Sequence, residues 1–96
     1  MLFAIQCTDR PGTTELRAST RPPHLAWLEA NIARLVFVGP VLAPDGTACG
    51  SILVVEAKDL DDARAFAAAD PYAAAGLFEA TVVRGFRPVF RDGAKA

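Results

Sequence analysis

The sequence predicts an α+β fold in which the elements follow the order strand, helix, strand, strand, helix, strand. Short apolar runs typical of strands and two segments with helical spacing alternate along the chain. The expected strands are residues 2–8, 35–42, 50–57 and 77–90, and the expected helices are residues 22–33 and 59–70. Hydrophobic residues make up 52% of the 96 residues and charged residues 22%, which is enough for a packed core. We therefore expect one globular domain over residues 1–96.

The first strand and first helix are separated by a turn and a polar stretch. Residues 2–8 carry apolar side chains at odd and even positions, which predicts a central strand buried on nearly both sides. Residues 9–12, Asp-Arg-Pro-Gly, are typical of a turn. Two consecutive prolines, Pro22 and Pro23, fit only the first turn of a helix, so we expect the helix to begin at Pro22 and residues 13–20 to form a loop. The helical apolar arc consists of Leu25, Leu28, Ile32 and Leu35, with His24 on its edge.

The second half of the chain predicts a hairpin, a capped helix and a long last strand. Pro44-Asp45-Gly46 separates two β-branched runs and predicts the turn of an antiparallel hairpin. Asp59 is a favourable N-cap, and the helix that it begins ends at Asp70 before Pro71. One further turn over residues 72–75 stops at Gly76. In the last strand we expect a bulge at Gly85 and an exposed edge at Pro88, followed by a frayed tail over residues 91–96.

This element order is the ferredoxin-like arrangement, in which two helices cover one face of a four-stranded antiparallel sheet. The first and third strands are then central. Because the strands are apolar on both sides, the other sheet face should pack against a second copy, giving a sheet-on-sheet homodimer. The connectivity also brings the polar candidates to one end of the sheet: His24, Ser51 and Asp70 directly, with Arg17, Arg21 and Tyr72 on segments entering or leaving that end.

Charge and cysteine content exclude several classes of function. Ten Lys and Arg residues against eleven Asp and Glu give a formal net charge of -1, without the basic block that binds nucleic acid or anionic membranes. No apolar run approaches the roughly 20 residues of a membrane span, and the first residues lack a basic leader, so we expect a cytoplasmic protein. Cys7 and Cys49 have no metal-binding spacing and are expected to be free thiols, without a bound metal.

His24 and Asp70 are the strongest catalytic candidates. His24 is the only histidine, and a carboxylate-oriented imidazole is the usual proton-transfer group near neutral pH. Each candidate also has a structural explanation, because a histidine can simply pack and an aspartate before proline can cap a turn. Tyr72 and Ser51 can likewise serve packing or a backbone group, and Arg17 and Arg21 can be solvated charges. If the arginines bind a ligand, their geometry suits a carboxylate or phenolate.

Several short motifs carry a resemblance to a known family. They are Arg21-Pro22-Pro23-His24-Leu25, Gly39-Pro40, Gly50-Ser51, Ala69-Asp70-Pro71-Tyr72, Ala75-Gly76-Leu77-Phe78 and Phe86-Arg87-Pro88-Val89-Phe90. Over nearly its whole length the chain resembles the YciI-like family of the dimeric α/β-barrel superfamily. The resemblance implies a dimer of ferredoxin-like subunits and a site built on His24 and Asp70. It also implies dehydrochlorinase-type chemistry on a chlorinated hydroxyquinol, which needs proton transfer but no metal or organic cofactor.

Three functions remain open on the sequence alone. The first is a cofactor-independent lyase or isomerase, in which Asp70 fixes the tautomer of His24 and His24 moves a proton of a small, activated, aromatic or acidic substrate. Arg17, Arg21, Ser51 and Tyr72 are its expected substrate-binding residues. The second is a cofactor-free monooxygenase, distinguished by oxygen uptake. The third is a non-catalytic dimeric module that binds a small acid.

Overall fold

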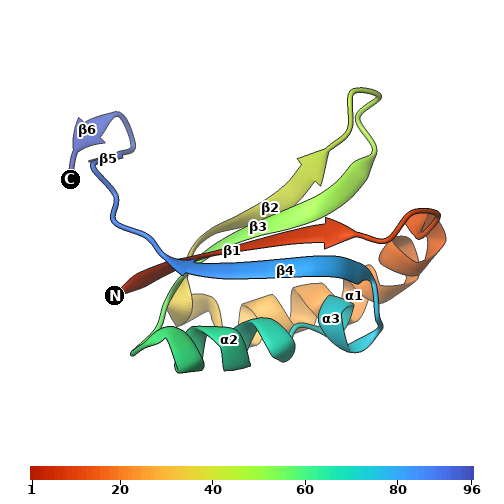
Figure 1. The fold of residues 1–96 in the computed structure, drawn as a ribbon, viewed down its shortest axis with the longest axis horizontal. Coiled ribbons are helices and arrows are strands. Elements are labelled where there is room, and N and C mark those ends of the chain that lie inside the picture. Colours follow the sequence, from red (N-terminus) through yellow and green to blue (C-terminus); the bar gives the residue numbers. More distant parts are fainter.

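The computed structural model describes residues 1–96 and has the predicted α+β architecture (Figure 1). The elements are β1 (Leu2–Asp9), α1 (Thr14–Ala30), a 3-10 turn (Ile32–Arg34), β2 (Leu35–Leu42), β3 (Ala48–Glu56), α2 (Leu60–Ala68), α3 (Pro71–Ala74), β4 (Phe78–Gly85), β5 (Phe90–Arg91) and β6 (Ala94–Lys95). The first four long strands form one sheet in the order β2-β3-β1-β4. All neighbours in this sheet are antiparallel. This confirms the ferredoxin-like fold with β1 and β3 at its centre.

The helices all lie on one face of the sheet, and the core fills the space between them (Figure 1). In β1 the alternate residues Phe3, Ile5 and Cys7 are buried against the helices. Leu53 and Val55 of β3 lie beside them across the ladder. The intervening residues of β1 are half-buried or exposed, so within one chain β1 is buried on one face rather than on nearly both.

Helix α1 begins eight residues earlier than predicted and contains Pro22 and Pro23 in its interior. The expectation was wrong because it weighed only local effects. A proline inside a helix costs roughly 3 kcal/mol or more through the lost N–H and a ring clash. Here the first turns of α1 are held by Arg17, which is buried and hydrogen-bonded to the sheet. The residues whose carbonyls lose their partners, Ala18 and Ser19, are exposed, so water can replace those bonds.

The buried face of α1 is also different from the predicted apolar arc. The buried residues of this helix are Arg17 and His24, which are seven positions apart and therefore on one face. Ile32 is 70% exposed, because α1 ends at Ala30 and the chain turns before β2. Trp27 and Leu28 pack partly buried against the core. His24 thus lies inside the molecule, not on the rim of an apolar face.

The second helical segment follows the prediction closely. The Asp59 side chain caps α2 by accepting a hydrogen bond from the Asp62 N–H. The chain leaves helical geometry at Asp70, whose φ and ψ are -59° and 125°, as expected before proline. The single turn α3 then ends at Gly76, which has a φ of +77°. The result is a sharp corner that points the Asp70 carboxyl group toward α1.

The C-terminal residues differ from the prediction. β4 ends at Gly85, and the irregular pairing lies at Thr8 and Asp9 of β1 rather than at Gly85. Residues 90–95 form a small hairpin instead of a continued strand and a frayed tail. Asp92 and Gly93 both have positive φ, 52° and 75°, and Asp-Gly is the preferred dipeptide of a two-residue hairpin loop. That signal was present in the sequence and was overlooked.

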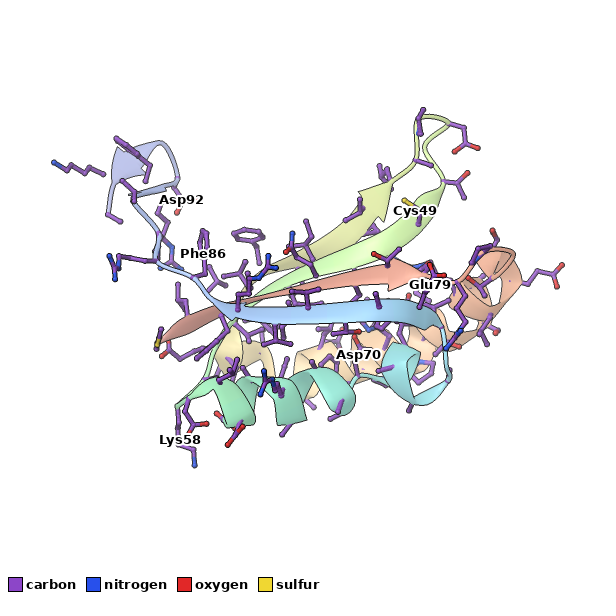
Figure 2. All side chains as sticks on the ribbon, in the orientation of Figure 1. Cys49, Lys58, Asp70, Glu79, Phe86 and Asp92 are labelled. Atoms are coloured by element: carbon purple, nitrogen blue, oxygen red, sulfur yellow. The ribbon has the colours of Figure 1, made fainter.

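The sheet face opposite the helices is open, and the C-terminal segment projects from that side (Figure 1). Phe86 lies there, away from the helices (Figure 2). Large apolar side chains are well exposed on this face or beside it: Phe37 59%, Leu42 58%, Val82 38%, Phe86 43%, Val89 62% and Phe90 68%. None of the helices is both long and apolar enough to cross a membrane.

Candidate functional site

His24 and Asp70 meet between α1 and the corner that joins α2 to α3. The His24 Nδ1 atom lies 2.8 Å from Asp70 Oδ1, and the two residues are only 6% and 2% exposed. The same Asp70 oxygen accepts a hydrogen bond of 2.9 Å from the Tyr72 backbone N–H. Because a carboxylate can only accept, the hydrogen of this pair belongs to Nδ1, and Nε2 is left for other partners. Figure 2 shows Asp70 enclosed between the sheet and the helices.

The ring of Tyr72 covers His24 and connects it to a cation. The two rings stack with centroids 4.0 Å apart and planes inclined by 22°. The Arg17 guanidinium carbon lies 4.6 Å from the centroid of the Tyr72 ring, within cation–π range. Burial raises the pKa of the Tyr72 hydroxyl, although the positive charges of Arg17 and Arg21 oppose this. The hydroxyl is therefore neutral at physiological pH and can donate a hydrogen bond.

Arg17 is held in place by protein groups. Its Nε and Nη2 atoms form a two-point contact with Asp9 at 2.7 and 3.0 Å. Nη2 also donates to the Gly50 carbonyl and to Ser51 Oγ, both at 2.9 Å. Burial alone lowers the pKa of Arg17, but the hydrogen bonds and charge of Asp9 more than offset it, so the pKa is raised. Arg17 therefore remains charged and fixed against the sheet.

A small cavity opens beside these residues, with a volume of about 250 Å³. Its polar lining residues are Arg17, Arg21, His24, Ser51 and Tyr72. Its apolar lining residues include Leu25, Leu28, Val38 and Pro40. A larger hollow of about 530 Å³ lies at α2 and β4, but it is shallow and its only titratable group is Arg64. The smaller cavity is the better candidate site because it is lined by His24, whose ring is held by a carboxylate.

Five of the six residues predicted for the site line this cavity, and the sixth, Asp70, is buried and contacts the lining residue His24. Five are connected by direct contacts: Asp70, His24, Tyr72, Arg17 and Ser51. Arg21 is exposed at the cavity, and its side chain forms no hydrogen bond or ion pair with the protein.

Asp9, the partner of Arg17, was not among the predicted site residues, because residues 9–12 are typical of a turn. The continuous helix that brings Arg17 to Asp9 did have a signal in the sequence. Arg17, Arg21, His24 and Leu28 follow at spacings of four, three and four, which is one face of a continuous helix.

No three His, Cys, Asp or Glu side chains are close enough together to hold a metal ion. Cys7 is buried opposite Ser51 in the β1–β3 ladder, and burial raises its pKa to about 11. Cys49 is exposed, and both cysteines are free thiols. Cys7 is therefore a small neutral side chain of the core.

Comparison with known proteins identifies clear relatives. The YCII-related domain matches residues 1–87. Protein YciI of Escherichia coli O6:H1 is 41% identical over 98 aligned positions, which cover 94% of this chain and all of the relative. An uncharacterised protein of Haemophilus influenzae is 35% identical with the same coverage.

One solved structure is also similar in sequence and in fold. It is 5-chloro-2-hydroxyhydroquinone dehydrochlorinase (TftG) from Burkholderia phenoliruptrix AC1100, in complex with 2,5-dihydroxybenzoquinone. The two chains are 38% identical with a TM-score of 0.83, over 91% of this chain and 94% of the other. This neighbour is a dehydrochlorinase that binds a small ligand. The fold, the matched domain and these relatives together show that the chain belongs to the YCII-related family.

Proposed function

We propose that the protein is a cofactor-independent enzyme of the lyase type, with His24 as its proton-transfer group. The observation that carries this proposal is the 2.8 Å contact between His24 Nδ1 and Asp70 Oδ1 at the wall of a cavity. Asp70 is itself fixed by the Tyr72 N–H, so it orients the imidazole, and Nε2 is the nitrogen that exchanges a proton with the substrate. Positioned acid–base catalysis contributes roughly 10²–10⁴-fold, which suits an already activated substrate.

The proposed reaction is the elimination of HCl from a chlorinated, hydroxylated ring, by analogy with the dehydrochlorinase neighbour. The elimination shifts one hydroxyl proton to the ring carbon that bears chlorine, then releases chloride and a second hydroxyl proton. The electron pair that the ring gives up in becoming a quinone leaves with chloride, so no external oxidant is consumed. His24 can serve both proton movements, first as base and acid and then as base again.

The cavity suits a substrate with a single ring. Its volume of about 250 Å³ lies below the roughly 300–1,000 Å³ of sites for drug-sized ligands. Leu25 and Val38 offer apolar surface to the ring of the substrate. Tyr72 and Ser51 also line the cavity, and their hydroxyl groups can form hydrogen bonds with the oxygens of the substrate. We assign substrate binding to Arg21, Ser51 and Tyr72, and we assign Arg17 to holding Ser51 and Tyr72 in position.

The test is turnover of 5-chloro-2-hydroxyhydroquinone by wild type, His24→Asn and Asp70→Asn, with Arg64→Gln as a control remote from the cavity. We expect one chloride released per quinone formed, without oxygen uptake. His24→Asn should lose at least 10²-fold in kcat while its circular dichroism stays native. Oxygen uptake in step with turnover would instead indicate the monooxygenase function. Binding without turnover in wild type would indicate the binding module.

We also propose that two copies pair through the open sheet face. Exposed apolar residues are concentrated there, with Phe37 at 59% and Phe86 at 43% exposure. A monomer seldom leaves such a patch in water, and a second copy supplies an equivalent surface in a two-fold arrangement.

A further inference from the structure

We propose that Arg21 is the residue that recognises a negatively charged oxygen on the ligand, and that the site therefore selects anionic over neutral rings of the same shape. This inference rests on the proposed function, because it concerns the ligand of the same cavity. It separates the roles of two arginines that the sequence could not distinguish. The two arginines differ in whether the protein already compensates their positive charge.

The charge of Arg17 is compensated. Asp9 forms a two-point ion pair with it, and both side chains are nearly buried, with side-chain exposures of 11% and 8%. Nη2 additionally donates to the Gly50 carbonyl and to Ser51 Oγ. A ligand anion that approached Arg17 would compete with Asp9 in a region of low dielectric constant, where the carboxylate is already in place. Arg17 therefore supports the Tyr72 ring and contributes little net positive charge to the cavity.

Any charge on His24 is also compensated. A protonated imidazole would carry its positive charge 2.8 Å from the Asp70 carboxylate, which is 2% exposed. His24 and Asp70 then form a neutral pair. His24 can transfer a proton, but it is not a free cation for a ligand.

Arg21 is the cation that lines the cavity without an anionic partner. It lies four positions after Arg17 and three before His24, on the same face of α1. Its guanidinium is exposed and makes no hydrogen bond or ion pair within the chain. Burial raises the pKa of the nearby Tyr72 hydroxyl, and the charge of Arg21 opposes that rise. An anionic oxygen at the cavity mouth can therefore pair with Arg21 while the ring lies against Leu25 and Leu28.

The test compares two ligands of similar shape and different charge. We would measure Kd by calorimetry at pH 7 for 2,5-dihydroxybenzoquinone, which is anionic, and 2,5-dimethylbenzoquinone, which is neutral. Because quinones react with exposed thiols, all variants would carry Cys49→Ser. The variants are Arg21→Gln, Arg21→Lys and the control Arg64→Gln, an exposed arginine of α2 outside this cavity.

We expect Arg21→Gln to weaken binding of the anion on the order of 10-fold and to leave binding of the neutral ring unchanged. Arg21→Lys should restore most of the affinity, and Arg64→Gln should have no effect. Added salt should weaken anion binding in wild type and not in Arg21→Gln, because an exposed ion pair is screened.

An unchanged Kd for the anion in Arg21→Gln would overturn the inference, as would an equal loss for both ligands, which would indicate a structural role. Failure of the anion to bind wild type would overturn it as well. None of these results decides the proposed function, which depends on turnover and on its loss in His24→Asn.

Discussion

Removing the Asp70 side chain should destabilise the protein by about twice or more the cost of removing an ordinary helix cap. Asp70 has two partners on one oxygen, the Tyr72 N–H at the start of α3 and the Nδ1 of His24. Asp59 provides a matched control, because it caps α2 through the Asp62 N–H in the same way, but it is exposed and touches no histidine. The pair Asp70→Ala and Asp59→Ala therefore separates the histidine contact from the cap.

The magnitudes follow from the two kinds of contact. Loss of an aspartate N-cap costs about 1 kcal/mol, which is the whole expectation for Asp59→Ala. In Asp70→Ala the same loss is joined by a buried histidine donor left without a partner, which costs about 1–3 kcal/mol more. We expect a total of about 2–4 kcal/mol. Asp70→Ser keeps a capping oxygen but is too short to reach His24, so it should recover the cap portion only.

The assay is urea denaturation at pH 7, followed by circular dichroism at one fixed protein concentration. The coupling between the two residues comes from a cycle with His24→Ala and the double variant. In the double variant the histidine donor is absent as well, so its cost should be less than the sum of the single costs. The reasoning is refuted if Asp70→Ala costs no more than Asp59→Ala, or if the cycle shows no coupling.

Two further predictions concern the thiols and the open sheet face. In the folded protein at pH 8, Ellman's reagent should react with one thiol per chain, that of Cys49, and Cys7 should react only in urea. Rapid reaction of two thiols in the folded protein would contradict the burial of Cys7. Burial raises the pKa of Cys7 from 9.0 to about 11, so its thiol ionises at lower pH in the unfolded chain than in the folded protein. The free energy of unfolding should therefore fall between pH 9 and 11 by on the order of 2–3 kcal/mol, and Cys7→Ala should reduce this decline. In sedimentation analysis wild type should be a dimer, whereas Phe37→Glu with Phe86→Glu should be a monomer; a monomeric wild type would contradict pairing through this face.

The first three strands, the hairpin between the second and third, and the second helix were predictable because local signals and tertiary packing agree in those segments. The turn at Pro44-Asp45-Gly46 and the cap at Asp59 both lie where the sequence places them. The start of α1 was not predictable from local rules, because Pro22 and Pro23 oppose a continuous helix. The turns before these prolines are tied to the sheet by the ion pair and hydrogen bonds of Arg17, whose partners lie on β1 and β3.

The same contact explains why the site could be located from the sequence but its charges could not be assigned. Connectivity places Arg17 and Arg21 at the same end of the sheet, so both are candidates for binding an anion. Only the pairing of Asp9 with Arg17 distinguishes them, and that pairing joins the end of β1 to a turn of α1 that looked like a loop. Once α1 is continuous, Arg17, Arg21 and His24 lie on one face, and each has a different electrostatic environment. A helix that tolerates two prolines therefore places one neutralised arginine, one free arginine and one carboxylate-bound histidine along a single cavity wall.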